Sequence, residues 1–285
     1  MTATASPVAI AIKNVLFATD LSPASETAFR VAQAIAGRHQ AQLHCVNVGG
    51  NYYQLLEPEP LNITFRELPD AASYPTEALK RLFTGLPTQL PVQPGEIWEV
   101  VNEIIRRREI DLLVVGTHAR HGIDRLIHGS IAEEVLRNAT CPVLTVRPDV
   151  QLQNDGKFAI HRVLLATDFD PHSDACCYAA ELCNHYQARL TILHVDQKNS
   201  PDDANRNVRR VVEALSLWSV ADAIIENGEP ADEILQTASQ LNPELIVLGA
   251  RHQEPARINS HLPRPTIAKV VAGARCPVLT VRQLD

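Results

Sequence analysis

The chain repeats itself, and this repeat constrains its fold more than any other feature of the sequence. Four segments of the first half recur in the same order in the second half. The pairs are 14–29 with 162–177, 41–48 with 188–195, 95–118 with 228–251, and the heptapeptide "CPVLTVR" at 141–147 with its copy at 276–282. The shared order predicts a duplicated domain. We expect a first domain over 1–147, a linker over 148–160 and a second domain over 161–285.

Each copy alternates short apolar runs with amphipathic stretches. In the first copy the apolar runs are Val15–Thr19, Leu43–Val48, Leu112–Val115 and Val143–Val146. They are too continuous for a sheet with one wet face, so they favour parallel strands with helices on both faces. The pattern predicts two open, doubly wound α/β domains of five strands each.

The amphipathic stretch after the first strand carries a helix-start signal in both copies. Ser22 fits an N-cap and Pro23 the first helical position. Asp170 and Pro171 fill the same two places in the second copy. The Pro-rich segment 49–91 gives no clear pattern until a helix face around 79–83, and it fits a lid, a partner surface or a passive loop equally well.

Composition restricts the partners and the compartment. The formal net charge of −7 disfavours a nucleic-acid backbone or an anionic membrane as the main partner. No apolar segment reaches the length of a membrane span, and the N-terminus lacks a basic targeting region, so we expect a cytoplasmic protein. The six cysteines form no C-x-x-C pair. Cys176 and Cys183, seven positions apart, are expected in the core of one helix face.

Two features of the first copy follow directly after predicted strands. Asp20 follows the first strand, and a loop beginning at Gly116 leads to Gly129 and Ser130. Ser130 with Glu133 has the form of a capping box at a helix start. Ligands of parallel sheets bind at the carboxyl ends of strands, and a helix N-terminus can receive an anion. The loop therefore fits a phosphate cradle, but a common helix start with a capping Asp explains the same residues.

The residues resemble the universal stress protein family in its tandem two-domain form. The resemblance covers nearly all of both halves. It is carried by "ATD" after the first strand, "VVGTH" after the fourth, and the closing segments "HGSIAEEVLRNATCPVLTVRP" and "GARCPVLTVR". It implies two Rossmann-like (adenine nucleotide alpha hydrolase-like) domains, each with five parallel strands. Some members of this family bind ATP and others do not.

The resemblance implies an ATP site in the first copy. The family's ATP loop places Gly, two residues, Gly, nine residues, and then Gly with Ser or Thr. Here Gly116 and the pair Gly129-Ser130 keep this spacing, but the middle position is Ala119. Ala there costs about 1 kcal/mol if positive φ is needed, and little if only space is needed. The implied nucleotide contacts are Ala18, Asp20, Val48, Val115, Gly116, Ala119, Gly129, Ser130 and Ile131.

The second copy departs from the ATP pattern. Asp168 and Gly249 are retained, but the loop after Gly249 contains no glycine. Pro265-Thr266 is aligned with Gly129-Ser130, and Lys269 with Glu133. Because proline lacks an N–H, we expect a structural role for this copy. The family resemblance implies pairing of the final strands, here between the two halves of the chain or in a homodimer.

Three classes of function remain open. The first is a cytoplasmic stress-response protein that binds ATP in its N-terminal domain and is not an enzyme, with no catalytic residue and no metal assigned. The second is an interaction module without a nucleotide, acting through a dimeric surface. The third is an enzyme such as a slow ATPase, which the absence of a G-x-x-x-x-G-K motif disfavours. A metal site of His118, His121 and His128 lacks a carboxylate or thiolate partner.

Overall fold

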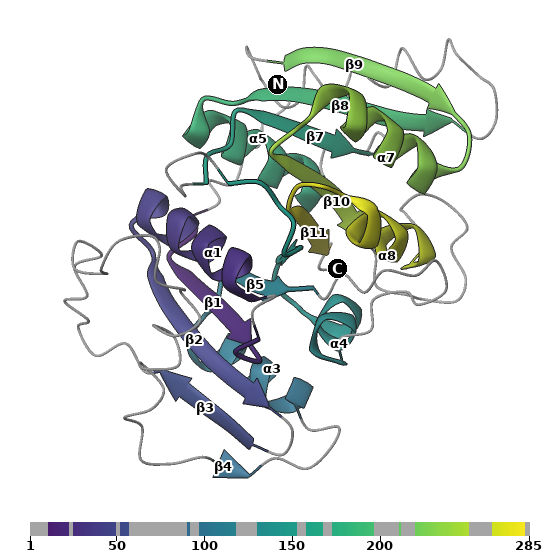
Figure 1. Ribbon diagram of the computed structural model, residues 1–285. Coiled ribbons are helices and arrows are strands. Elements are labelled where there is room, and N and C mark those ends of the chain that lie inside the picture. Colours follow the sequence, from purple (N-terminus) through teal and green to yellow (C-terminus); the bar gives the residue numbers. More distant parts are fainter. Residues whose placement is uncertain are drawn as a thin grey trace, which may run out of the picture. The chain divides into compact units, whose positions relative to one another are not determined.

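The fold is that of a computed structural model, which describes residues 11–22, 25–49, 52–56, 90–91, 97–117, 130–152, 158–167, 173–196, 211, 220–250 and 264–282. The chain divides into two compact units, an N-terminal unit of Ile12–Ala159 and a C-terminal unit that contains Ile160–Asp285. Each unit combines a mostly parallel sheet with packed helices (Figure 1). The predicted α/β class with tandem domains is confirmed.

The N-terminal unit is built around four parallel strands in the order β2-β1-β5-β6. Helix α1 lies on one face of this sheet, and α3 and α4 lie on the other. The elements are β1 (Asn14–Thr19), α1 (Glu26–His39), β2 (Gln42–Gly49), β3 (Tyr52–Leu56), β4 (Leu90–Pro91), α3 (Ile97–Arg107), β5 (Leu112–Gly116), α4 (Ser130–Asn138) and β6 (Val143–Val146).

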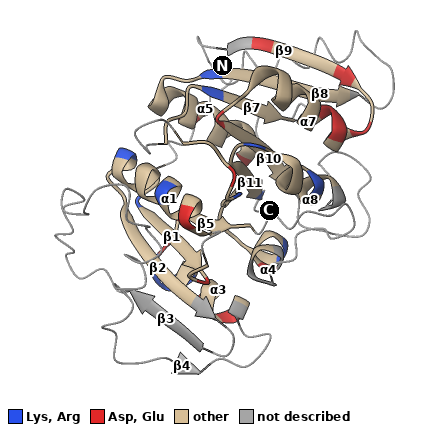
Figure 2. Cartoon of the chain, in the orientation of Figure 1, with Lys and Arg blue, Asp and Glu red and all other residues tan. Residues whose placement is uncertain are grey.

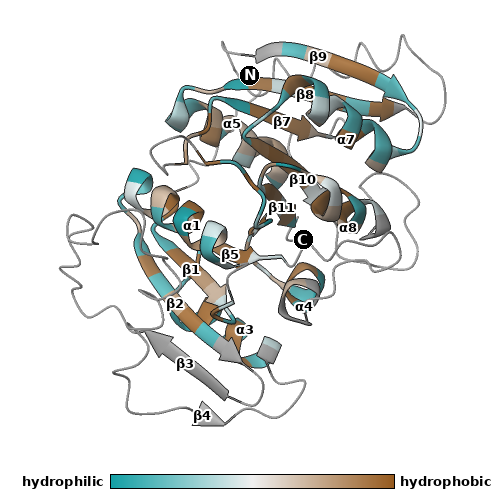
Figure 3. Cartoon of the chain, in the orientation of Figure 1, coloured by the Kyte–Doolittle hydropathy of each residue, from teal (hydrophilic) through white to brown (hydrophobic). Residues whose placement is uncertain are grey.

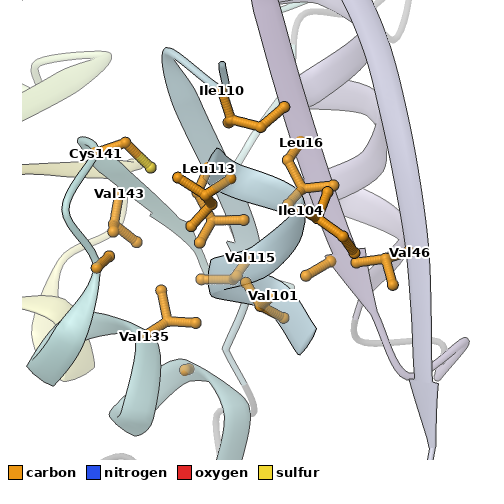
Figure 4. Close-up of a cluster of buried hydrophobic side chains, with 14 residues drawn as sticks. Leu16, Val46, Val101, Ile104, Ile110, Leu113, Val115, Val135, Cys141 and Val143 are labelled. Carbon is orange, nitrogen blue, oxygen red and sulfur yellow. The ribbon is translucent and has the colours of Figure 1, made fainter. Parts of the chain in front are cut away.

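Both faces of the central strands β1 and β5 are buried, because these strands are apolar at most positions. Alternate residues of β1 and β5, such as Leu16 and Leu113, pack against α3 and α4 in the cluster of Figure 4. The residues between them face α1, where the rings of Phe17 and Phe29 lie 5.4 Å apart. Burying one such side chain contributes about 1.5–3 kcal/mol. The central strands β1 and β5 carry no charge and are among the apolar strands (Figures 2 and 3).

The edge of the N-terminal sheet differs from the five parallel strands predicted for this copy. Strand β3 pairs antiparallel with β2, and β4 pairs antiparallel with β3. Only Gly50 and Asn51 separate β2 from β3 in the chain. Two residues can join antiparallel strands, whereas a parallel pair needs a crossover of a dozen or more. The short connection therefore dictates the antiparallel edge.

The C-terminal unit holds five parallel strands, as predicted, in the order β11-β10-β7-β8-β9. Helix α5 covers one face, while α7 and α8 pack together on the other. The elements are β7 (Arg162–Ala166), α5 (Asp174–Tyr186), β8 (Arg189–Asp196), β9 (Val220–Asn227), α7 (Pro230–Leu241), β10 (Leu245–Ala250), α8 (Arg264–Gly273) and β11 (Val278–Arg282).

The first helix of each unit begins three residues later than predicted. The N-cap of α1 is Ser25, not Ser22, and the N-cap of α5 is Ser173, where Asp170 was expected. The backbone N–H of Ser25 donates to the Ser22 carbonyl at 3.0 Å. Ser22 therefore forms a turn ahead of the helix. In the first copy, Ser22 marks this turn, and the helix start lies beyond it.

The same two helices end alike. Gln40 and Gln187 take left-handed conformations with φ of 54° and 56°. In both units the next residue closes a bond back into the last turn, from the Ala41 N–H to the Ala36 carbonyl at 2.8 Å and from the Ala188 N–H to the Cys183 carbonyl at 2.9 Å. Such left-handed caps satisfy carbonyls that the helix end leaves open. The duplication thus preserves local geometry as well as strand order.

Within the described part of the chain, no helix has the length and apolar character needed to cross a membrane.

Candidate functional site

Four of the predicted contacts, Ala18, Asp20, Val115 and Gly116, lie where the strand order reverses. From β1 the chain passes to β2 on one side of the sheet, and it later returns to β5 on the other side of β1. Ala18 of β1 is in register with Val115 of β5. Asp20 and Gly116, which follow Ala18 and Val115, therefore flank the boundary between β1 and β5. In parallel sheets, ligands bind in the crevice outside this boundary.

The predicted contacts Ala18, Val48, Val115 and Gly116 lie within paired strands. The side chains of Ala18 and Val115 are buried and belong to the core that α3 and α4 cover. Gly116 is in register with Val146 of β6, and Val48 of β2 is in register with Tyr53 of β3. A ligand at the ends of these strands would meet peptide groups and the side chains of the loops that follow.

Asp20 stands on an ordered turn at the end of β1. Its side chain is exposed, and its Oδ1 accepts a hydrogen bond from the Ser22 N–H at 3.0 Å. The N–H of Leu21 donates to Thr19 Oγ1 at 2.9 Å, and Leu21 takes a left-handed φ of 58°. A carboxylate held at the rim of the sheet can accept hydrogen bonds from a ligand.

The loop that leaves β5 is described only at its two ends. Thr117 is buried, and its N–H donates to the Val146 carbonyl at 2.9 Å. Helix α4 begins at Ser130, which was predicted as its N-cap, and Ile131 lies in its first turn. Ala119 and Gly129 lie outside the described residues, as do the histidines and arginines predicted beside them. The first turn of α4 brings peptide N–H groups that can receive an anion.

The C-terminal unit presents different chemistry at the equivalent helix. Matched hydrogen bonds close the two helices, from the Ala139 N–H to Val135 and from the Ala274 N–H to Val270, both at 2.8 Å. Counted from this shared end, Pro265 corresponds to Ser130 and Lys269 to Glu134. The predicted alignment, which placed Pro265 at Gly129 and Lys269 at Glu133, is therefore off by one residue.

Helix α8 is tied to its neighbour through Lys269. Its Nζ lies 2.7 Å from an Asp232 carboxylate oxygen and 3.4 Å from one of Glu229, both near the start of α7. The pKa of Lys269 is raised by its hydrogen bond with Asp232, so the ammonium stays charged. Pro265 lies in the first turn of α8 and removes one N–H from it. This helix start fits a packing role.

Four of the six cysteines have thiols whose pKa is raised by burial. Burial raises the pKa of Cys45 and of Cys183 to about 12, and burial is also the main cause of the same value at Cys141 and Cys276. Thiols with such a pKa stay protonated and are poor metal ligands. Cys176 and Cys183 are both buried on α5, which confirms their predicted place in the core. The described ranges contain no group of three residues suited to a metal ion.

Two residues beside Asp20 were missed by the sequence reasoning. Thr19 and Ser25 are buried, and their hydroxyl oxygens lie 2.9 Å apart behind the turn. The sequence offers one signal, because the turn "TDLSPAS" contains two serines that could cap the helix. Pattern alone does not decide between them, since the outcome depends on where the Thr19 hydroxyl lies in the folded turn.

Known proteins resemble the chain over nearly its whole length. The model of the universal stress protein family matches residues 11–147 and 159–282. Universal stress protein A homolog 1 of Coxiella burnetii is 32% identical over 145 residues, which cover 47% of this chain and 95% of that protein. A relative of this kind corresponds to one half of the chain.

Solved structures share the fold. A universal stress protein from Archaeoglobus fulgidus is 20% identical and aligns with a TM-score of 0.62, covering 94% of this chain and 98% of its own. A protein of unknown function from Pseudomonas aeruginosa PAO1 is 15% identical, with a TM-score of 0.59 and coverage of 95% and 93%. Two tandem matches to one family model span most of the sequence, and the chain therefore belongs to the universal stress protein family.

Proposed function

We propose that the chain is a cytoplasmic stress-response protein that binds an adenine nucleotide, ATP, in its N-terminal unit. The observation that carries this proposal is the position of Asp20 and Gly116 on the two sides of the boundary between β1 and β5. The base would lie beside Asp20, Ala18 and Val48. The ribose and phosphates would lie beside Val115, Gly116, Ala119, Gly129, Ser130 and Ile131.

The chemistry of the two helix starts supports a single site per chain. The first turn of α4, which begins at Ser130, has peptide N–H groups that can receive a phosphate. At α8, Pro265 lacks the corresponding N–H and Lys269 is held by Asp232 and Glu229. The C-terminal unit accordingly has a structural role, and the chain acts by binding the nucleotide without turning it over. Homodimer formation stays a prediction.

A matched pair of variants tests this assignment by calorimetry with ATP. Asp20→Asn keeps the size of the side chain but replaces an acceptor oxygen by a donor NH₂, so it should weaken binding by about tenfold or more, as expected for a lost hydrogen bond to a charged group. Asp168→Asn makes the same change at the equivalent position of the second copy and should leave binding unchanged. Equal weakening by both variants would contradict a single N-terminal site.

A second pair of measurements addresses the phosphates and turnover. Gly129→Pro should abolish binding, because it stiffens the loop beside the first turn of α4 and removes an N–H. Incubation with ATP should release no ADP above the uncatalysed rate. If neither unit binds ATP at millimolar concentration, the chain is better explained as an interaction module.

A further inference from the structure

A chain of hydrogen bonds with one defined direction holds the turn that carries Asp20. The Ser25 hydroxyl donates to the Ser22 carbonyl at 2.7 Å, which uses its only proton. The 2.9 Å contact between Thr19 Oγ1 and Ser25 Oγ must therefore run from Thr19 to Ser25. Thr19 Oγ1 in turn accepts the Leu21 N–H at 2.9 Å. Both hydroxyl groups are thus committed to the turn.

This turn contains a conformation that needs outside support. Leu21 has a φ of 58°, a left-handed conformation that side chains with a Cβ rarely adopt. Residues of this kind persist where their surroundings over-determine them, and they cluster at binding and switch sites. Here the Leu21 N–H is fixed by Thr19, and the next N–H, of Ser22, is fixed by Asp20 Oδ1. The hydroxyl of Thr19 and the carboxylate of Asp20 therefore accept hydrogen bonds from consecutive peptide N–H groups of one turn.

In the second copy, the counterpart of Ser25 has a different role. Ser173 is the counterpart of Ser25, and it caps α5 in the usual way, with ψ of 144° and a bond from the Cys176 N–H. Ser25 has ψ of −5° and makes no side-chain cap bond. A lost cap normally weakens a helix start. In the first copy, the Ser25 hydroxyl donates to the turn beside Asp20 and does not cap the helix.

Thr167, the counterpart of Thr19, contacts a cysteine. The Thr167 hydroxyl oxygen lies 3.6 Å from Cys176 Sγ, whereas the Thr19 hydroxyl oxygen lies 2.9 Å from Ser25 Oγ. Cys176 corresponds to Ala28 in the repeat, so the two threonines have partners at different positions. Sulfur is a weak hydrogen-bond partner, so the contact between Thr167 and Cys176 is weaker than the one between Thr19 and Ser25. Among the described residues, the first copy thus pairs its threonine hydroxyl with the serine hydroxyl, while the second copy places its threonine beside a cysteine.

We propose that Thr19 and Ser25 are positioning residues, which fix the Asp20 carboxylate for recognition of an adenine base. The inference rests on the proposed function. Adenine carries an amino group where guanine carries a carbonyl oxygen. A carboxylate fixed in place accepts from the amino group and repels the carbonyl, whereas a mobile one turns away at little cost. Thr19 and Ser25 touch no ligand in this account and act through Asp20 alone.

The test measures dissociation constants of the intact protein for ATP and GTP by calorimetry. Thr19→Val keeps the shape of the side chain and removes the hydroxyl, while Thr19→Ser keeps the hydroxyl. We expect Thr19→Val and Ser25→Ala each to weaken ATP binding about fivefold, the factor of one neutral hydrogen bond, and to lower the preference for ATP over GTP. Thr19→Ser should stay close to the wild type.

The second copy provides the matched controls. Thr167→Val and Ser173→Ala should leave both dissociation constants unchanged, although Ser173→Ala should lower the melting temperature through its lost cap. A purely structural role for Thr19 would lower the melting temperature without changing the ratio of ATP to GTP affinity. If Thr19→Val does not fold, the comparison of Ser25→Ala with Ser173→Ala decides the matter on its own.

The failure of each proposal is distinguishable. If the wild type binds ATP and neither Thr19→Val nor Ser25→Ala changes the affinity ratio, the positioning role is wrong and the nucleotide site stands. If the wild type binds no adenine nucleotide, the proposed function fails and the positioning role fails with it.

Discussion

Asp111 and Asn14 bind each other reciprocally at the amino ends of β5 and β1. The Asn14 N–H donates to Asp111 Oδ2 at 2.8 Å, and the Asp111 N–H donates to the Asn14 carbonyl at 2.9 Å. Glu244 and Arg162 repeat this relationship in the C-terminal unit, at 2.7 Å and 3.0 Å. Both carboxylates lie at the amino ends of the strands, opposite the carboxyl ends where the candidate site lies. The duplication therefore conserves this pair of hydrogen bonds, while the residues at the carboxyl ends of the strands differ between the copies.

The hydrogen bonds between Glu244 and Arg162 make the stability of the C-terminal unit depend on pH. Burial of the Glu244 carboxyl disfavours its charged form, but hydrogen bonds from the Arg162 side chain and from the backbone of Arg162 and His161 outweigh burial and lower the pKa below its ordinary 4.5. A lowered pKa contributes stability that is complete above about pH 4.5 and is lost as the pH falls through the folded-state value.

We therefore expect Glu244→Gln to flatten the loss of stability in acid. Urea unfolding followed by circular dichroism from about pH 7 to about pH 3 should show a smaller decrease for the variant than for the wild type. Arg162→Leu removes the guanidinium but keeps the backbone donors, so its effect should be intermediate. An acid slope that is unchanged in Glu244→Gln would contradict this role of the carboxylate.

Alkylation should modify one of the six thiols faster than the other five. Cys177 is half-buried, while the other cysteines are buried. At about pH 8 a thiol with a pKa of about 12 is ionised in about one molecule in ten thousand, so Cys45, Cys141, Cys183 and Cys276 should resist alkylation. Mass spectrometry after iodoacetamide should find Cys177 modified first in the native protein, and all six cysteines modified in urea. Equal rates in the native protein would show that these strands and helices open readily.

Two glycine-to-alanine changes should have opposite effects. Gly37 lies in α1, and a Cβ there would meet nothing within 4 Å. Gly37→Ala should stabilise the N-terminal unit by roughly 0.5–1 kcal/mol, because alanine loses less backbone entropy in a helix. Gly228 has φ of +155°, and a Cβ there would also contact the Glu233 carboxylate. Gly228→Ala should destabilise the C-terminal unit by about 1 kcal/mol or more. Differential scanning calorimetry measures both changes, and a gain in stability from Gly228→Ala would contradict the described backbone.

The strands were predictable because short, continuous apolar runs of this kind are typical of buried parallel strands. Val143–Val146 was predicted with the bounds observed, and Val15–Thr19 and Leu112–Val115 each lack one end residue. Because the strands are parallel, Asp20 and Gly116 were expected together at the carboxyl ends of the strands. The antiparallel strand β3 was not predicted, because the Pro-rich segment after Val48 gave no periodic signal.

The starts of α1 and α5 and the Thr19–Ser25 pair could not be obtained from pattern. Ser25 and Ser173 occupy the same place in the repeat, yet one hydroxyl supports a turn and the other caps a helix. The difference depends on the partner of each hydroxyl in the folded turn, which residue type does not encode. By contrast, Asp111 and Glu244 were detectable in principle, because an acidic residue stands at the same position in both copies.

The stoichiometry of ATP binding to the intact wild-type chain tests the central claim most directly. Calorimetric titration should give one ATP per chain, because one copy keeps Gly116 with Gly129-Ser130 and the other has Pro265 and a tethered Lys269. Two ATP molecules per chain would contradict the structural role of the C-terminal unit. No binding at millimolar ATP would contradict the account of the N-terminal site as a whole.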